Sequence, residues 1–261
     1  MDKTLSDRQK RLLAELPGLR LSALREALEG QFAHPETYEG MCFEERLGEL
    51  LESLKSERWR RRCETLLKKS RLRGQMLLDD IRTGEKRGFT GTLKAQISSL
   101  NWTREGQIRN IAALGPSGSG KTAILSAAGT FCAEAGLSVR YCKYTDLLTE
   151  LTEDDKPARD RLRRELKKTK VLIMDDFGIM QCTDLGAGRL YEVLDDRMNV
   201  SPVVIGSQLT RQGIAKAVGG GTAVRDGIMR RLFGSCIEFT LKPEGPAEWL
   251  GTAPVPEAQA S

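Results

Sequence analysis

A glycine-rich loop that ends in lysine and threonine constrains the fold of this 261-residue chain more than any other feature. The segment Gly115-Pro116-Ser117-Gly118-Ser119-Gly120-Lys121-Thr122 matches the pattern G-x-x-x-x-G-K-[ST] at every position. An apolar stretch, 110–114, precedes it, and a helical pattern starts at Lys121. A phosphate-binding loop requires this order of strand, loop and helix. The sequence therefore predicts a loop whose backbone N–H groups and helix N-terminus hold nucleotide phosphates.

The side chains of this loop indicate the cofactors. Lys121 is expected to reach the β- and γ-phosphates, and the Thr122 hydroxyl is expected to ligate Mg²⁺. No Asn-Lys-x-Asp segment, typical of guanine recognition, occurs in the chain. We therefore expect ATP and Mg²⁺ as cofactors and ATP hydrolysis as the reaction.

Two neighbouring acids follow a second apolar stretch, Val171-Leu-Ile-Met-Asp175-Asp176. Such a strand end supplies one carboxylate to Mg²⁺ and a second that orients the attacking water. We assign Asp175 to Mg²⁺ and Asp176 to activation of the water. The letters Asp-Phe-Gly at 176–178 also occur in protein kinases, but the accompanying His-Arg-Asp loop is missing, which excludes that interpretation.

The pattern of apolar residues changes near residue 85, which predicts two folded parts. Leucines recur at helical spacing in the first hundred residues, where no strand is evident. Glycines cluster at Gly84, Gly88 and Gly91, which suggests a linker. We expect a small helical domain over 1–84, a nucleotide-binding domain over 85–242 and a flexible proline-rich tail over 243–261. The second part contains five short apolar runs with helical patterns between them: 108–114, 137–143, 171–176, 203–208 and 236–241. This alternation predicts an α/β fold with a five-stranded parallel sheet covered on both faces.

Polar residues at the end of the fourth apolar run and before the fifth run are further candidates for the catalytic site. Gln208 is preferred over Ser207 as a partner of the water or the γ-phosphate. Arg225, Arg230 and Arg231 share one helical stretch, and an arginine supplied across a subunit boundary stabilises the charge on the transferring phosphoryl group. Surface arginines that only solvate the helix are the alternative.

Two segments concentrate the positive charge. Residues 58–73 and 156–170 carry net charges of +7 and +6, whereas the whole chain has +5. Charge segregated in this way favours a polyanion such as nucleic acid, although solvated helices also show it. The expected DNA-contacting residues are those of the first segment: Arg58, Arg60, Arg61, Arg62, Lys68, Lys69, Arg71 and Arg73.

Composition excludes several classes of protein. The six cysteines form no Cys-x-x-Cys pair, and His34 is the single histidine, which argues against a zinc site. No apolar run approaches the roughly 18 residues of a membrane span. The charged N-terminus does not resemble a secretory signal, so we expect a cytoplasmic protein with no membrane partner.

Taken with these motifs, several further segments resemble the IstB-type ATPases, the helpers of bacterial insertion sequences, which belong to the AAA+ superfamily beside the DnaC-type helicase loaders. The resemblance is carried by Leu16-Pro-Gly-Leu-Arg-Leu, Phe43-Glu-Glu-Arg-Leu-Gly-Glu-Leu-Leu, Asp80-Ile, Asn101-Trp102, the two nucleotide motifs, Ser207-Gln208-Leu209 and Arg231-Leu232. It implies an AAA+ domain with a small helical N-terminal domain, and a homo-oligomer that binds duplex DNA and delivers it to a partner transposase in transposition. It also implies that Arg231 is the arginine supplied in trans. The chain departs from the family in one respect. The family usually has an arginine after the last strand that senses the γ-phosphate, and the segment Lys242-Pro-Glu-Gly-Pro has none.

Two other functions remain open. A helicase loader of the DnaC type would grip a replicative helicase through its N-terminal helices and prefer single-stranded DNA. A small-molecule kinase would need an acceptor pocket and a lid. Aromatic residues make up only 5% of the chain, which argues mildly against a platform that stacks single-stranded bases.

Overall fold

The computed structural model describes residues 5–242 and divides the chain into two compact units, Met1–Thr65 and Leu66–Ser261. The tail predicted over 243–261 lies outside the described residues. It includes most of the segment that lacks the family's arginine after the last strand. None of the helices within 5–242 is both long enough and apolar enough to cross a membrane.

The first unit is helical, as predicted. It consists of α1 (Asp7–Glu15), α2 (Ser22–Ala33), a short 3-10 helix and the first part of α3 (Phe43–Ser70). Ser6 begins α1 with a capping box, in which its hydroxyl accepts from the Gln9 N–H while the Gln9 side chain accepts from the Ser6 N–H. Its buried side chains include Leu13, Ala23 and Leu50. This is a small core, so the unit depends on few contacts.

The second unit is built on a five-stranded parallel sheet in the order β2-β3-β4-β1-β5. The strands are β1 (Asn110–Leu114), β2 (Val139–Lys143), β3 (Val171–Asp175), β4 (Val203–Ser207) and β5 (Cys236–Thr240). All five predicted runs are strands, although β1 and β2 begin at Asn110 and Val139 rather than at 108 and 137. Because the strands are parallel, the ends of β1, β3 and β4 meet at one edge of the sheet.

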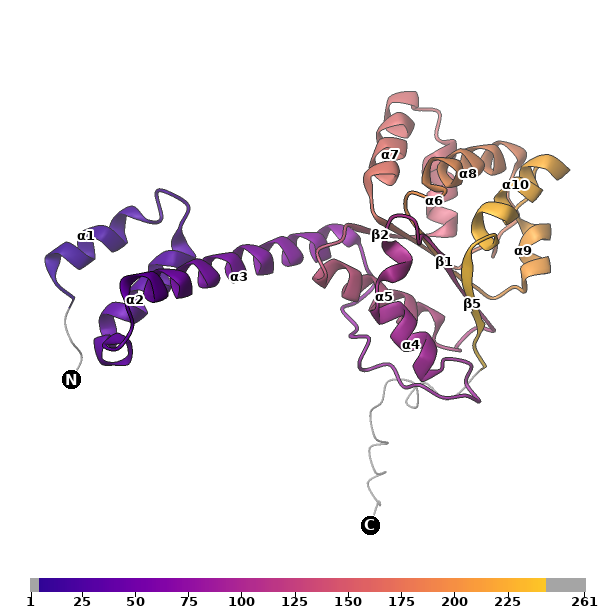
Figure 1. Cartoon of the computed structure of the whole chain (residues 1–261). Helices are drawn as coiled ribbons and strands as arrows, with labels where there is room; N and C mark the ends of the chain where they lie inside the picture. Colours follow the sequence, from indigo (N-terminus) through magenta and orange to yellow (C-terminus); the bar gives the residue numbers. More distant parts are fainter. Residues whose placement is uncertain (1–4, 243–261) are drawn as a thin grey trace, which may run out of the picture. The chain divides into compact units, whose positions relative to one another are not determined.

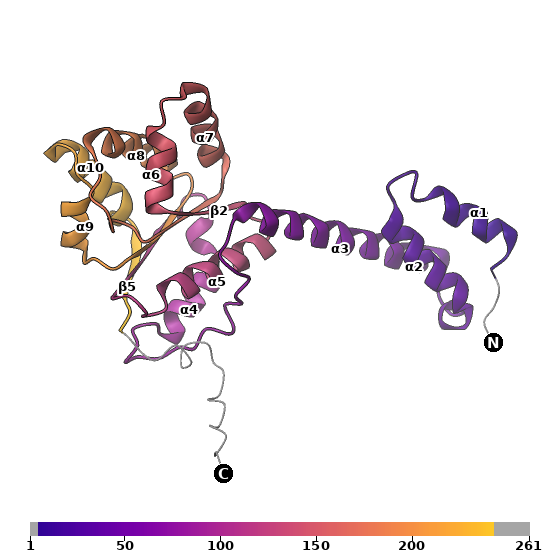
Figure 2. The same cartoon turned by 180° about the vertical axis from the view of Figure 1, so that it is seen from behind.

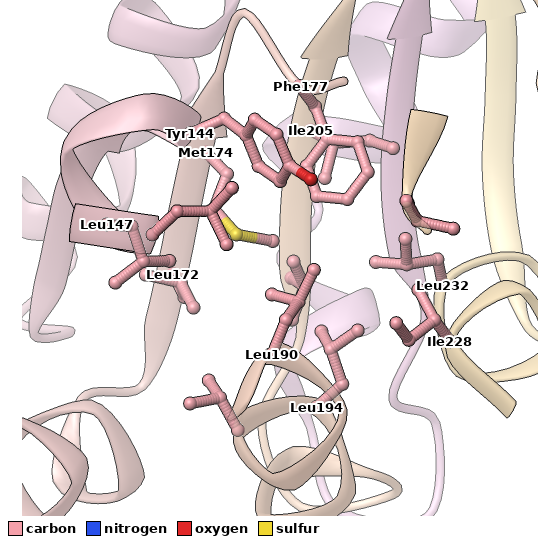
Figure 3. Close-up of a cluster of buried hydrophobic side chains, with 14 of the residues drawn as sticks. Tyr144, Leu147, Leu172, Met174, Phe177, Leu190, Leu194, Ile205, Ile228 and Leu232 are labelled. Atoms are coloured by element: carbon pink, nitrogen blue, oxygen red, sulfur yellow. The ribbon is translucent and has the colours of Figure 1, made fainter. Parts of the chain in front are cut away.

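Helices cover both faces of this sheet (Figures 1 and 2). On one face, α4 (Gly91–Ser98) and α5 (Lys121–Glu134) pack over buried residues such as Ile111 and Ile173. The other face carries α6 (Tyr144–Thr152), α7 (Lys156–Lys168), α8 (Asp184–Arg197), α9 (Arg211–Ala217) and α10 (Thr222–Phe233). Figure 3 shows the core on this second face, where Leu190 and Leu194 of α8 lie over Leu172 and Met174 of β3. Apolar residues on both sides explain why the inner strands β1, β3 and β4 read as nearly continuous apolar runs.

The glycine cluster after Thr83 is a packed loop rather than the predicted linker. Gly84 and Phe89 form a backbone bridge, and Phe89 is fully buried with its ring 5.7 Å from the Phe239 ring. Leu78 and Ile81, upstream of the loop, belong to the core on the α5 face. The compact unit therefore begins at residue 66, earlier than the boundary predicted near residue 85, because residues 66–84 bury apolar side chains against the sheet.

Candidate nucleotide site

The loop between β1 and α5 has a backbone conformation that depends on its glycines. Gly115, Gly118 and Gly120 all have positive φ angles, and α5 begins at Lys121 as predicted. A Cβ at Gly115 would lie 2.4 Å from the carbonyl oxygen of Leu241, so this position excludes every other residue. The loop is thus shaped by its contact with the end of β5 as well as by its own sequence.

Lys121 is held over the mouth of the loop. Its ammonium group donates to the carbonyl oxygens of Gly115 at 2.8 Å and Pro116 at 2.7 Å, and the residue is only 6% exposed. Burial lowers the pKa of Lys121, and the charges of Asp175 and Asp176 act in the opposite direction. The two carboxylates therefore favour the charged form of a cation that burial disfavours.

Asp175 is fully buried at the end of β3 and accepts three hydrogen bonds. Its Oδ2 accepts from the Thr122 hydroxyl at 2.7 Å and from the Tyr141 hydroxyl at 2.7 Å. Its Oδ1 accepts from the backbone N–H of Asp176 at 2.9 Å. A buried carboxylate requires such partners, because without them its desolvation would be costly. The structure therefore brings together Thr122 and Asp175, which are far apart in the sequence.

The chemistry of this cluster fits Mg²⁺. The Thr122 hydroxyl and the Asp175 carboxylate supply the oxygen ligands that Mg²⁺ prefers, and both lie beside the phosphate loop. Gly206 of β4 lets the Asp175 side chain pack closely against β4, because a Cβ there would lie 2.8 Å from Asp175 Oδ1. Thr122 and Asp175 are thus the residues that would hold the ion.

Asp176 begins a tight turn that the end of β4 holds in place. It is half-buried and has a φ of 54°, in the left-handed region. The next residue, Phe177, donates its N–H to the Gly206 carbonyl at 2.7 Å and accepts from the Ser207 hydroxyl at 2.6 Å. The centroids of the Phe177 and Tyr144 rings lie 4.5 Å apart. Both side chains are labelled in Figure 3. An uncommon backbone conformation fixed in this way is often found at functional sites.

Ser207 and Gln208, the two candidates at the end of β4, lie in different surroundings. Ser207 is fully buried, and its hydroxyl also accepts from the Leu209 N–H at 3.1 Å. Gln208 is exposed and lines a cavity of about 600 Å³ together with Gly115 and Pro116 of the phosphate loop. Ser207 therefore holds the turn, while Gln208 is free to face a ligand beside the loop.

The arginines of α10 divide into fixed and exposed side chains. Arg231 donates to Asp195 and to the Tyr191 hydroxyl, lies 4.1 Å above the Tyr191 ring, and its side chain is 7% exposed. Arg230 is exposed, and Arg225 lies 3.6 Å from Asp226. Within one protomer, Arg231 therefore packs α10 against α8, and Arg230 is the more accessible of the two.

The basic residues predicted to contact DNA are likewise not equivalent. Arg60 and Arg61 both bind Glu57 and lower its pKa to about 2, and Arg60 also binds Glu64. Arg62 lies 5.6 Å from the Trp59 ring. Within residues 5–242, four of these side chains are exposed and make no hydrogen bond or ion pair: Arg58, Lys68, Lys69 and Arg71. Arg73 is exposed too, and its charge acts on Tyr141.

Three of the exposed cations, Lys68, Lys69 and Arg71, line a groove of about 390 Å³ at the start of β2. Glu165 and Thr169 of the second basic segment line the same groove, and Glu165 is paired with the buried Arg140 at 3.3 Å. The ends of the two basic segments therefore meet in space. In α7 itself, Arg163 and Lys167 pair with acids of α8.

A family model described as IstB-like ATP binding protein matches residues 14–245. The chain belongs to the IstB-like ATP-binding proteins. This IstB-like chain is 33% identical over 199 residues to an ATP-binding protein of insertion sequence IS1162 from Pseudomonas fluorescens, which covers 76% of this chain and 85% of the relative. The predicted resemblance is thereby confirmed.

Solved structures of other proteins share the fold of the IstB-like chain. DnaI superposes with a TM-score of 0.55 at 18% identity, over 70% of this chain and 92% of DnaI. AMPPCP-bound DnaA from Aquifex aeolicus superposes with a TM-score of 0.54 at 17% identity. That alignment covers 65% of this chain and about half, 51%, of DnaA.

Sequence reasoning missed two residues of the site, Tyr141 and Gly206. Tyr141 lies inside an apolar run and carries no motif, so its place beside Asp175 follows only from the pairing of β2 with β3. Gly206 could have been noticed as a glycine inside a strand, which often marks a close approach of another group.

Proposed function

We propose that this chain is a Mg²⁺-dependent ATPase that assembles on duplex DNA and delivers it to a partner transposase. The observation that carries the proposal is the cluster of Lys121, Thr122, Asp175 and Asp176 at the strand ends of an IstB-like domain. The relatives are ATP-binding proteins of insertion sequences, which supports a role in transposition.

The residues of the site divide the work of hydrolysis. Phosphate oxygens would replace the Gly115 and Pro116 carbonyls as partners of the Lys121 ammonium group. When bound, Mg²⁺ neutralises charge on the phosphates. Asp176 would accept the proton of the attacking water, since its neighbour Asp175 is occupied by Thr122 and Tyr141. Gln208 would orient the water or the γ-phosphate.

DNA contact is assigned to the groove of Lys68, Lys69 and Arg71, with Arg58 as a further cation. Free ammonium and guanidinium groups can release counterions from phosphates, whereas Arg60 and Arg61 would first have to leave Glu57. Contacts of this kind position the protein on the duplex without reading its sequence. Binding should therefore depend steeply on salt and weakly on sequence.

We propose that hydrolysis depends on assembly, because an arginine of α10 in one copy contacts the nucleotide bound to a second copy. Arg231 was the residue implied by the family resemblance, but its side chain is already bound to Asp195 and Tyr191. The exposed Arg230 is better placed to reach the nucleotide of a second copy. This contact would couple ATP turnover to the homo-oligomer.

Fluorescence anisotropy of random-sequence duplex and of matching single strands, titrated with the full chain in Mg²⁺ and either ATP or ADP, tests the proposal. When the nucleotide is ATP, we expect tighter and cooperative binding to duplex. We expect the products of the reaction to be ADP and phosphate. Preference for single strands would favour the helicase-loader alternative. Affinity that does not change with salt, or transfer of phosphate to a metabolite, would contradict the proposal.

A further inference from the structure

A tyrosine outside the nucleotide motifs contacts the carboxylate assigned to the metal. Tyr141 lies in the middle of β2, the edge strand beside β3, and the residue is 4% exposed. Its hydroxyl donates to Asp175 Oδ2 at 2.7 Å, the same oxygen that accepts from Thr122. The Tyr141 ring belongs to the apolar core of the α5 face, and within residues 5–242 its hydroxyl makes one hydrogen bond, to Asp175.

The hydrogen bonds on Asp175 leave little freedom for its carboxylate. An ionised carboxylate offers about four lone-pair positions, two on each oxygen. Thr122 and Tyr141 occupy both positions of Oδ2, and the Asp176 N–H occupies one of Oδ1. One position of Oδ1 therefore remains, and Oδ1 lies close against Gly206, where a Cβ would come within 2.8 Å of it.

We propose that Tyr141 is a positioning residue that fixes the rotation of the Asp175 carboxylate, so that Oδ2 stays beside the Thr122 hydroxyl at the Mg²⁺ site. The inference rests on the proposed use of Mg²⁺-ATP. Thr122 alone does not fix this rotation, since its hydroxyl is also a ligand for the metal. Tyr141 takes no part in the reaction and acts only through Asp175. Groups that orient ligands in this way are typically worth about 10- to 100-fold in metal affinity.

The variant Tyr141→Phe removes only the hydroxyl and keeps the buried ring. Tyr144→Phe is a matched control, because Tyr144 is also fully buried but lies on the other face of the sheet and packs against Phe177. For the full chain and both variants, the affinity for a fluorescent ATP analogue is measured in EDTA and across a Mg²⁺ titration, together with the melting temperature without nucleotide.

For Tyr141→Phe we expect the Mg²⁺ concentration at half-maximal enhancement of binding to rise about tenfold. The affinity in EDTA should stay within about twofold, and Tyr144→Phe should behave like the unaltered chain. An unchanged Mg²⁺ midpoint would overturn the inference. So would an equal loss of affinity with and without Mg²⁺, which is the pattern of a general packing defect.

This experiment is separate from the test of the proposed function. Nucleotide binding that responds to Mg²⁺ but leads to no hydrolysis in the unaltered chain would contradict the proposed ATPase and leave the Tyr141 comparison fully informative. Binding by the unaltered chain that does not respond to Mg²⁺ would overturn the inference about Tyr141, whatever the rate of hydrolysis.

Discussion

The nucleotide site and the basic segments both consist of charged residues, but their surroundings differ. At the nucleotide site, Lys121 and Asp175 are buried, and each charged atom is bound to a named partner within 3 Å. Along α3, Lys68 and Lys69 are exposed and unpaired, and Arg60 is bound only to acids of its own helix. A buried charged side chain therefore has one set of partners that the fold tolerates, whereas an exposed charged side chain can adopt many arrangements.

This difference predicts how each region responds to substitution. A buried charge has lost its water and depends on its partners, so removing one partner changes the energy of the others by several kcal/mol at most sites. An exposed cation contributes through its distance from a phosphate, and its loss is partly compensated by its neighbours. Effects should be large and specific at the nucleotide site, and small and graded along α3.

Lys121→Ala should have the largest effect. It removes two charge-assisted hydrogen bonds to phosphate, which corresponds to about 4 kcal/mol or roughly a thousandfold in ATP affinity. Equilibrium binding of a fluorescent ATP analogue measures the loss, and ATP-dependent binding to duplex should vanish with it. Retention of tight ATP binding would show that the buried cation is not a phosphate ligand.

Asp176→Asn should slow hydrolysis by about 10²- to 10⁴-fold, the range for a general base, while ATP affinity changes less than about twofold. The side chain keeps its size at the strained turn, so the fold should be unaffected. Single-turnover phosphate release, compared with nucleotide binding on the same protein, separates the two effects. Normal turnover would mean that another group activates the water.

The pair Arg231→Ala and Arg230→Ala contrasts a fixed with an exposed arginine on one helix. Arg231→Ala leaves Asp195 and Tyr191 without their partner and should cost about 2 kcal/mol of stability, about 4 to 8 °C in melting temperature. Arg230→Ala should change stability by no more than about 0.5 kcal/mol. Its effect should appear as lower ATP turnover in the DNA-bound assembly alone, whereas equal loss by the dilute protomer would exclude a role in trans.

Replacing Lys68, Lys69 and Arg71 together by glutamine should reduce duplex affinity by about tenfold and lower the slope of log affinity against log salt by about 2.7, or 0.9 per phosphate contact. ATP affinity should not change. Arg60→Gln with Arg61→Gln is the matched control and should alter the slope by less than about 1, because both side chains are paired with Glu57. An equal loss of duplex affinity in both variants would show that paired and unpaired cations contribute equally to DNA binding.

Much of the second unit could be predicted because its inner strands β1, β3 and β4 are buried on both faces. The five apolar runs, the loop ending in Thr122 and the acids after β3 each have a local pattern that few other structures satisfy. The parts that were missed have no such pattern. Phe89 and its flanking glycines read as a linker, yet the segment packs against β5 through contacts that are distant in the sequence.

The sequence by itself determined the class of fold, the nucleotide loop and the pair of acids, because backbone geometry and burial allow few residue types at those positions. Only the tertiary structure decided which charges are free and which are already bound. Arg231 and Ser207 prove to hold neighbouring segments, while Tyr141 proves to hold Asp175. The reason is that a side chain's role in a site depends on the two or three atoms around its polar end, and the order of the strands brings those atoms together.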